Sequence, residues 1–467
     1  MNKRRNFIKK TGLLAMAAIT GSGSATARTV SEEKKETVKL SKRKLTVDDR
    51  WDVIVAGGGP GGCTAAISAA REGAKTLLIE AMGQLGGMGT SGLVPAWCPF
   101  SDGEKIIYRG LAEKIFNESK KGVPHEKPEK LDWVHINPEH LATVYDRMVT
   151  EAGVHVLFFS RLAGVEMLTP DTIDALIVAN KSGLMAFRAK VYIDTTGDGD
   201  LAAWSGASFR RGDEQGMVQS SSLCFSFARV DTYNYLNGPK LHTGNPQSPV
   251  HAAVESGKYP LIDKHFCNNL IGPDVVQFNA GHLRNVDSTD PWALSDAMMT
   301  GRKIAAQYLQ AMQDCQPQTF GGAFIVRTGS LLGVRDSRRI EGDYVFTLED
   351  WMQRRSFDDE IGRNCYYIDV HKHREVKPPR YAKGESHGIP YRCLTPRGLK
   401  NLLTAGRCIS TDEESFGSLR VMPPCLVTGE AAGMAAVHAI RQSKNDVHRI
   451  DVNHLRKRLR EEGQYLL

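Results

Sequence analysis

The sequence predicts an α/β protein built on a parallel sheet, with a second domain inserted into the first. Three observations point to this fold class. A strand, a glycine-rich turn, a helix and a second strand follow one another over residues 52–80. Further glycine-rich turns follow apolar strands at residues 195–200 and 405–407, whereas residues 216–388 lack such turns. At 467 residues the chain is also longer than one compact core ordinarily requires.

The N-terminus has the pattern of a twin-arginine export signal. Arg4 and Arg5 precede a weakly apolar run over residues 11–20 and an Ala-x-Ala site that ends at Ala27. The alternatives are a basic tail or a membrane anchor, but the apolar run is shorter than the roughly 20 residues of a spanning helix. We expect residues 1–27 to be a signal peptide and the mature protein to be periplasmic or otherwise exported, without an integral membrane segment. Residues 28–47 have the composition of a flexible spacer.

Charge and cysteine content limit the classes of partner and cofactor. The formal net charge is +7, but residues 1–27 contain five basic residues and no acid. The rest of the chain is therefore close to neutral, which predicts no nucleic-acid partner. The nine cysteines show no Cys-x-x-Cys spacing. This excludes the usual patterns for a c-type haem and for a clustered iron–sulfur site.

The unit over residues 52–80 carries a dinucleotide-binding pattern. Its Gly-x-Gly-x-x-Gly spacing provides a tight turn, a close approach for a pyrophosphate and room for the helix to pack on the strand. The helix N-terminus offers free N–H groups to the phosphates. Glu80 closes the second strand, where an acid accepts ribose hydroxyls. The residues expected at the phosphates are Gly57, Gly59, Pro60, Gly61 and Gly62.

Later elements follow the same alternation of helix and strand. A helix over 138–152 leads into a strand over 154–159, followed by a β-meander around 177–191 and a strand over 191–194. A long helix rich in small residues spans about 423–441. We assign a discontinuous nucleotide-binding domain to residues 48–100, 138–215 and 395–467, and an α+β substrate or cap domain to residues 101–137 and 216–394.

Several motifs resemble the FAD-dependent oxidoreductase family. They are Leu85–Met88 (Leu-Gly-Gly-Met), Arg335–Arg338 (Arg-x-Ser-Arg), Ile389–Leu394, Asn401–Ser410 and Gly417–Pro423. The glycine turns are also placed as in the FAD domain shared by the fumarate reductase and glutathione reductase classes. The resemblance covers nearly the whole chain after residue 50. It implies a split Rossmann-type domain that binds FAD non-covalently, and it says little about the substrate.

The resemblance also implies further cofactor contacts. Met88 belongs to the segment after the second strand, and the turn that contains Asp198 would lie on the adenosine side. The last helix would point its N-terminus at the flavin, where its dipole favours negative charge. Arg407 stands where the better-studied classes have an acid, so an acidic ribitol contact is not implied. The complete set of these implied contacts is Gly86, Gly87, Met88, Gly197, Asp198, Gly406, Arg407, Gly417, Ser418 and Val421.

Four residues are candidates for the chemical step: His387, Arg392, His282 and Arg284. The segment from His387 to Arg392 precedes the last strand, where the chain re-enters the FAD domain, so a neutral histidine there can move a proton. The alternative is that His387 only satisfies a buried carbonyl group. We expect Arg338 and Arg339 to form surface salt bridges.

The sequence predicts no metal site. His371 and His373 alternate on an expected strand, a spacing that occurs in metal sites. No convincing third ligand lies near them in the sequence.

We expect hydride transfer between a small organic substrate, sugar-like or a carboxylate, and flavin N5. Residues 216–388 lack a second glycine motif, so a built-in nicotinamide domain is not expected. One alternative is a reductase of an unsaturated acid that receives electrons from an external carrier. Another is a non-catalytic FAD-binding accessory protein.

Overall fold

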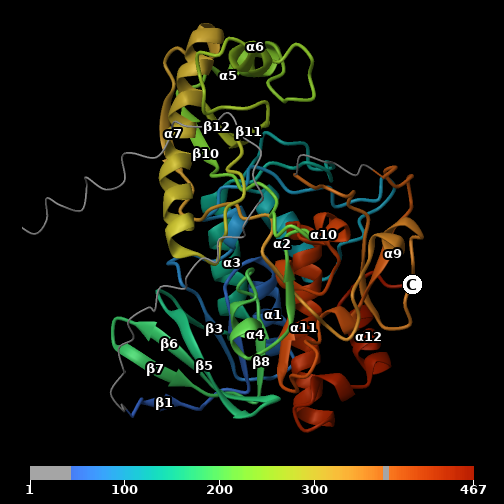
Figure 1. Ribbon diagram of the computed structural model, residues 1–467. Helices are drawn as coiled ribbons and strands as arrows, with labels where there is room; N and C mark the ends of the chain where they lie inside the picture. Colours follow the sequence, from blue (N-terminus) through green and yellow to red (C-terminus); the bar gives the residue numbers. More distant parts are fainter. Residues whose placement is uncertain (1–43, 372–377) are drawn as a thin grey trace, which may run out of the picture. The chain divides into compact units, whose positions relative to one another are not determined.

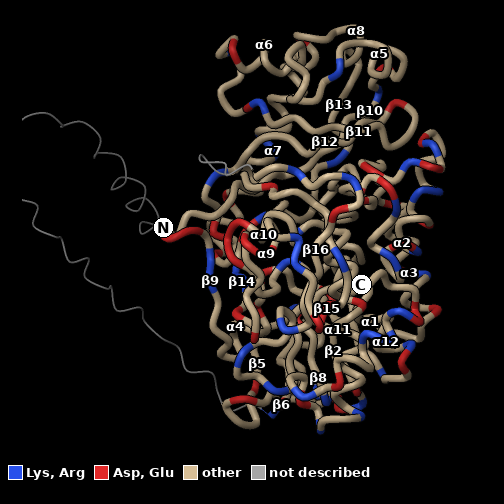
Figure 2. The backbone as a smooth tube through the Cα atoms, turned by 90° about the vertical axis from the view of Figure 1, so that its right-hand side faces the viewer, with Lys and Arg blue, Asp and Glu red and all other residues tan. Residues whose placement is uncertain are grey.

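The computed structural model describes residues 44–371 and 378–467. The predicted signal peptide, most of the predicted spacer and His373 lie outside these residues. Within the described chain no helix combines the length and apolar character needed to cross a membrane. Figure 2 shows that basic and acidic residues are interspersed along this part of the chain.

A five-stranded parallel sheet forms the centre of the nucleotide-binding part. Its order is β17 (Leu402–Thr404), β8 (Val191–Asp194), β2 (Val53–Ala56), β3 (Thr76–Ile79) and β4 (His155–Leu157). The four strands other than β4 are fully buried, because helices and a second sheet cover both faces. All neighbouring pairs run parallel. Their carboxyl ends therefore meet at one edge, where open α/β sheets bind ligands.

Two helices from opposite ends of the chain pack against each other beside this sheet (Figure 1). They are α1 (Pro60–Arg71) and α11 (Met422–Gln442). A Cβ atom on Gly429 would lie 2.0 Å from the Gly61 carbonyl oxygen, and one on Gly433 would lie 2.1 Å from that of Ala65. The small residues of α11 therefore bring the two backbones into contact.

A four-stranded sheet, seen in green and blue at the lower left of Figure 1, corresponds to the expected meander. Its order is β1 (Val47–Asp48), β7 (Gly183–Phe187), β6 (Thr172–Asn180) and β5 (Arg161–Thr169). Ile173, Leu176 and Val178 of β6 are buried in the same apolar cluster as Ile54 and Tyr192 of the parallel sheet. The predicted α/β fold, with a parallel sheet and a meander, is confirmed.

A second antiparallel sheet has its own core. Its order is β11 (Phe266–Gly272), β12 (Val275–Ala280), β10 (Phe225–Ala228) and β13 (Phe324–Thr328). The long helix α7 (Pro291–Cys315) packs along it (Figure 1). Phe225 and Phe266 stack on Tyr308 of α7 in this core, and Phe278 contacts the rings of Phe225 and Phe227.

The remaining elements connect these sheets. The helices α2 (Leu111–Lys120) and α3 (Pro138–Glu151) pack into the core of the parallel sheet. There are also two antiparallel strand pairs, β9 (Phe209–Arg211) with β14 (Arg338–Ile340) and β15 (Glu360–Asn364) with β16 (His387–Pro390). Short helices are α4 (Asp200–Trp204), α5 (Thr232–Asn237), α6 (Pro249–Glu255), α8 (Pro317–Phe320), α9 (Leu348–Met352), α10 (Glu413–Leu419) and α12 (Val452–Glu461). Phe346, Trp351, Ile361 and Ile389 join the core of the parallel sheet. The domain boundaries proposed from the sequence stay a prediction.

Candidate active site

The glycine-rich turn lies between the end of β2 and the start of α1. A Cβ atom on Gly57, whose φ is +105°, would lie 2.5 Å from the Thr195 carbonyl oxygen, and one on Gly62 would lie 1.8 Å from that of Gly57. These two glycines are therefore required for packing. A Cβ atom on Gly59 would meet no described atom within 4 Å. Gly59 is also the N-cap of α1 and has no side chain to bond the first helical N–H groups. The position fits a pyrophosphate.

Glu80 follows β3 directly and lies under this turn. Its carboxylate accepts hydrogen bonds from Gly58 N at 2.6 Å and from Met82 N at 2.7 Å. Burial raises the pKa of Glu80, while these two N–H groups act in the opposite direction. The carboxylate is thus held rigidly beside the glycines, and its ribose contact stays a prediction.

The segment from Gly86 to Met88 lies against the same turn. Gly86 N donates to Gly58 O at 2.8 Å. The φ of Gly86 is +94°, and a Cβ atom there would lie 2.6 Å from Thr90 Cγ2, so glycine is required for this close turn. The short helix Gly87–Gly89 follows, and the Met88 side chain reaches toward Gly333.

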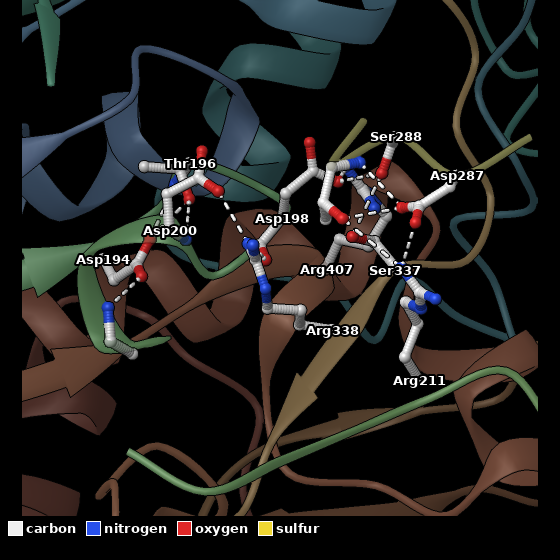
Figure 3. A network of polar contacts seen from close by, with 12 residues as sticks. Asp194, Thr196, Asp198, Asp200, Arg211, Asp287, Ser288, Ser337, Arg338 and Arg407 are labelled. Carbon is white, nitrogen blue, oxygen red and sulfur yellow. Dashed lines mark hydrogen bonds and ion pairs between the residues drawn. The ribbon is translucent and has the colours of Figure 1, made fainter. Parts of the chain in front are cut away.

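The Thr195–Asp200 turn is fixed by a buried carboxylate at the end of β8 (Figure 3). Asp194 accepts from Thr196 N at 3.0 Å, from Thr196 Oγ1 at 2.8 Å and from Ala202 N at 2.8 Å. Burial raises the pKa of Asp194 to about 6. The turn that contains Gly197 and Asp198 is therefore held in one shape.

Arg407 reaches across to this turn from the loop after β17 (Figure 3). Its Nη2 donates to Asp198 Oδ1 at 2.8 Å and lies against Gly197. Its Nη1 is buried and has no hydrogen-bond partner among the residues that the structure describes. An unsatisfied buried donor costs about 1–3 kcal/mol. An anionic oxygen of a phosphate would satisfy it, so the donor set fits the FAD that the sequence implies.

Arg338 and Arg339 form the expected ion pairs, but Arg339 is not at the surface. Arg338 Nη1 donates to Asp200 Oδ1 at 2.7 Å (Figure 3). The side chain of Arg339 is 3% exposed and donates to Asp336 Oδ1 and Gly212 O. The strand pair β9–β14 buries Arg339 beside Asp336, which corrects the expectation of a surface salt bridge.

The segment Gly417–Val421 comprises the last turn of α10 and the two residues that lead into α11. A Cβ atom on Gly417 would lie 2.9 Å from the Asp369 carbonyl oxygen. Ser418 Oγ accepts from Asn364 Nδ2 at 2.7 Å and donates to Tyr366 O at 2.6 Å. Val421 caps α11 in an extended conformation without a side-chain hydrogen bond, so the first N–H groups of this helix are not capped by a side chain. Gly406, with a φ of +79°, donates its N–H to Thr428 Oγ1 of the same helix.

The structure separates the predicted catalytic residues. His387 is fully buried, with Nδ1 2.8 Å from the Tyr381 hydroxyl and Nε2 3.2 Å from Asn364 Nδ2. Asn364 in turn donates to Ser418, so His387 is linked to the predicted flavin segment through one side chain. Arg392 instead pairs with Asp359, with 49% of its side chain exposed. Arg284 is exposed near His282. These four assignments stay predictions.

The structure brings together three histidines that are distant in the sequence. His282 Nε2 lies 3.1 Å from His371 Nδ1, and the His265 ring stacks on the His282 ring with centroids 4.5 Å apart. His265 precedes β11 and His282 follows β12, and the pairing of these antiparallel strands places them side by side. Asp263 lies 2.8 Å from His282 Nδ1, and Asp369 lies 3.2 Å from His371 Nε2. Nothing in the sequence around His265 indicates this role, because strand register leaves no local pattern.

The arrangement of the three rings favours hydrogen bonding over metal binding. One nitrogen of each ring lies within 4.8 Å of the others, a spacing that a metal ion could use. However, the planes of His265 and His282 differ by only 21° in their stack. Ring lone pairs lie in the ring plane, so those of two stacked rings run alongside each other and do not converge. Arg335 Nη2, a cation, also lies 3.3 Å from His265 Nε2.

Arg335 gives this histidine cluster a buried positive charge. Its Nη1 donates to Ser220 O at 2.8 Å and to Ser222 Oγ at 3.0 Å, and its Nη2 donates to Asn279 Oδ1 at 3.3 Å. These acceptors are all neutral. Within residues 44–371 and 378–467, no carboxylate forms an ion pair with Arg335. A buried cation without a paired anion favours an anionic ligand.

The histidine cluster adjoins the predicted flavin-binding segments. Arg420 directly precedes Val421 and donates to Asp369 O at 2.8 Å, with a second contact of 3.5 Å to Asp369 Oδ2. On another side, the Met88 side chain lies near Gly333, whose N–H donates to Ser222 O beside Arg335. Residues of the proposed cofactor site therefore lie directly beside the histidine cluster.

Comparisons with known proteins identify the family to which the chain belongs. The model of the family described as FAD dependent oxidoreductase matches residues 52–459. Glutathione reductase from Schizosaccharomyces pombe is 31% identical over 156 residues, a match that covers 32% of this chain and 31% of that protein. The chain thus aligns with less than a third of the length of this curated relative.

Two solved structures are similar at low identity. A geranylgeranyl bacteriochlorophyll reductase-like protein from Thermoplasma acidophilum has a TM-score of 0.44 at 13% identity, covering 91% of this chain and 93% of that chain. The p-nitrophenol 4-monooxygenase from Pseudomonas putida DLL-E4 has a TM-score of 0.46 at 11% identity, covering 85% and 82%. The family match spans most of the sequence and includes the glycine-rich turn, Glu80 and the Arg407 loop. The protein therefore belongs to the FAD-dependent oxidoreductase family, and its cofactor is FAD.

Proposed function

We propose that this enzyme transfers a hydride between a small organic substrate and flavin N5, and that the histidine cluster binds the reacting part of the substrate. The observation that carries the proposal is the contact of Asp369 with both Gly417 and Arg420. It joins the cluster to the segment that resembles a flavin-binding segment. Bound FAD supplies a two-electron acceptor for the hydride.

The substrate class follows from the charges of the cluster. Arg335 is buried and hydrogen-bonded only to neutral described groups. A carboxylate on the substrate would pair with it and offset the cost of burying its charge. His282 and His371 each keep 18% of the side chain exposed, so a ligand can reach them. We propose a hydroxylated carboxylate, with a sugar acid as one member of the class.

Reduction of an unsaturated acid by an external electron carrier is the second candidate. Arg335 favours it to the same extent, because both reactions use an anionic substrate. The direction of hydride transfer separates the two. If the enzyme oxidises its substrate, the substrate bleaches the oxidised flavin. If it reduces an unsaturated acid, that acid restores the colour of chemically reduced flavin.

The test is a substrate panel under anaerobic conditions. Hydroxy acids and sugar acids are mixed with the oxidised holoenzyme, and unsaturated acids with the reduced holoenzyme. Flavin absorbance is followed in both. Neutral alcohols of matched size are the controls. Reaction of neutral alcohols alone would contradict the proposed role of Arg335, and absence of any flavin response across the panel would contradict the proposed function.

We also propose that the protein is exported by the twin-arginine route with FAD already bound. The proposal rests on Arg4, Arg5 and the Ala-x-Ala site of the sequence. This route carries folded proteins, which suits an enzyme that must bind its cofactor in the cytoplasm.

A further inference from the structure

Four side chains form a continuous row that begins and ends with a carboxylate. Asp263 lies 2.8 Å from His282 Nδ1, His282 Nε2 lies 3.1 Å from His371 Nδ1, and His371 Nε2 lies 3.2 Å from Asp369 Oδ1. Every ring nitrogen of the two histidines thus faces another potential acceptor. We call these four side chains the carboxylate–histidine row.

The carboxylate–histidine row has fewer protons than contacts. Each of its three contacts needs one proton to become a hydrogen bond. A neutral imidazole carries one N–H and an ionised carboxylate carries none. Two neutral histidines therefore supply protons for two contacts, and two lone pairs face each other at the third. The row can accept one more proton and then has a hydrogen bond at every contact.

The distances indicate that the contact without a proton is the one between His371 and Asp369. The shortest contact, 2.8 Å, is between Asp263 and His282 Nδ1, and it suits an N–H donated to a carboxylate. His282 Nε2 is then an acceptor, and His371 must donate to it through Nδ1. This leaves a lone pair on His371 Nε2 at the longest contact. That end of the row adjoins Gly417 and Arg420 of the predicted flavin-binding segment.

We propose that His371 Nε2 is the base that takes the substrate proton, and that Asp263 and His282 are positioning residues that fix its tautomer. This inference rests on the proposed function. When an alcohol is oxidised, its C–H bond breaks and the hydride leaves with both electrons for the flavin. Its O–H bond also breaks, and the electron pair forms the C=O bond while the proton moves to His371 Nε2. In the reverse direction the same atom returns the proton.

The surroundings keep the base neutral before reaction. Burial, together with the nearby charge of Arg335, lowers the pKa of His371 to about 4, against the effect of Asp369. Arg420 acts in the same direction as Arg335, and the stacked His265 is also held neutral, because burial lowers its pKa well below the usual range. Protonated His371 would donate hydrogen bonds to Asp369 through Nε2 and to His282 Nε2 through Nδ1. These two contacts stabilise the transferred proton on His371.

Asp263→Asn provides the sharpest test. An asparagine amide can donate to His282 Nδ1 and so supplies the missing proton. His282 then donates through Nε2 to His371 Nδ1, and His371 donates through Nε2 to Asp369. Both histidines remain, but every contact of the row now has a proton, so His371 Nε2 can no longer accept one. The row predicts that this near-isosteric change slows flavin reduction about as much as His371→Gln, by at least ~10²-fold.

The control is His251→Gln, since His251 bonds only backbone carbonyl groups of Thr243 and Asn245 in the described structure. FAD content and thermal stability are measured for all three variants. Wild type should slow at low pH as His371 becomes protonated, and His371→Gln should lose this dependence. Reduction rates for Asp263→Asn within about threefold of wild type, with FAD bound, would overturn the proposal.

A second arm needs no substrate. Nitrogen NMR of histidine-labelled holoenzyme reports the tautomer of each ring. The expected result is His282 protonated at Nδ1 in wild type and at Nε2 in Asp263→Asn. An unchanged tautomer, or a stoichiometric metal ion that His282→Gln releases, would overturn the inference. If no substrate of the panel reacts with the flavin but the tautomer switches, the proposed function fails, whereas the proton arrangement inferred for the carboxylate–histidine row is confirmed.

Discussion

Gly87 lies against Gly59 so closely that a Cβ atom on Gly87 would be 3.1 Å from the Gly59 Cα atom, whereas a Cβ atom on Gly59 would point into open space. The two glycines are thus needed for different reasons. Gly87 lets two stretches of backbone touch. Gly59 leaves room for a ligand at the N-terminus of α1.

Gly59→Leu should therefore give a folded protein without colour. The φ of Gly59 is −70°, which any residue adopts, and the new side chain would occupy the proposed pyrophosphate position. We expect FAD affinity to fall by at least ~10²-fold, measured by flavin absorbance and equilibrium dialysis, with little change in the circular dichroism spectrum. Gly272→Leu is the matched control, because a Cβ atom there also meets no described atom within 4 Å. A yellow Gly59→Leu protein would place the cofactor elsewhere.

Arg407→Met should weaken FAD binding without unfolding the protein. The buried Nη1 of Arg407 has no partner within the described chain, and a charge-assisted hydrogen bond contributes about 1.5–3 kcal/mol. The expected loss is about 10- to 100-fold in FAD affinity. Arg210→Met is the control, because Arg210 pairs with Glu341 and 64% of its side chain is exposed. Equal affinities for both variants would show that Arg407 serves only Asp198.

Glu430→Gln should change how stability depends on pH. Glu430 is buried in α11, accepts from Leu111 N and Gln464 Nε2, and has a pKa that burial raises to about 7. Because this pKa is above its ordinary value of 4.5, the group stabilises the fold fully below pH 4.5 and loses this contribution as pH rises through 7. Wild type should therefore lose about 3 kcal/mol relative to Glu430→Gln between acid and alkaline pH.

Urea unfolding of both proteins at pH 5 and pH 8 measures this difference. Other titrating groups cancel in the comparison, since they are common to both proteins. A difference in unfolding free energy that stays constant between the two pH values would mean that Glu430 remains ionised in the folded state.

His387→Gln should affect stability more than chemistry. His387 is fully buried and bridges Tyr381 and Asn364, and glutamine cannot hold both contacts in the same geometry. We expect a loss of about 1–3 kcal/mol in unfolding free energy and a flavin reduction rate within about threefold of wild type. Rapid mixing of the variant with an active substrate gives the rate. A reduction rate that falls ~10²-fold while FAD stays bound would support the catalytic role that the sequence suggests.

Changing Arg4 and Arg5 together to lysine should block export. The twin-arginine pair is read by its receptor, and lysine keeps the charge but not the recognised side chain. Cell fractionation should find the precursor in the cytoplasm with FAD bound. The single change Lys9→Arg, which leaves the pair intact, is the control. Normal export of the double variant would point to another export route.

Local sequence patterns were sufficient for the nucleotide-binding unit but not for the histidine cluster. Gly57, Gly59 and Gly62 act within one turn, so their spacing specifies their geometry. His282 is a candidate from its own segment, and the sequence spacing groups His371 with His373 rather than with His282. Their contact depends on the position of Asp369 against Gly417 and on the register of β11 and β12. Such long-range packing leaves no spacing to read.

The backbone contact between α1 and α11 also sets an order of events during protein synthesis. The helix α1, which we expect to face the phosphates, is made early, and its partner α11 is made only when residues 422–442 emerge from the ribosome. Until then the small-residue face around Gly61 and Ala65 has nothing to cover it. We expect a chain interrupted before residue 422 to have the complete glycine-rich turn and yet not to hold its cofactor. Retention of the yellow colour would then distinguish full-length chains from truncated ones.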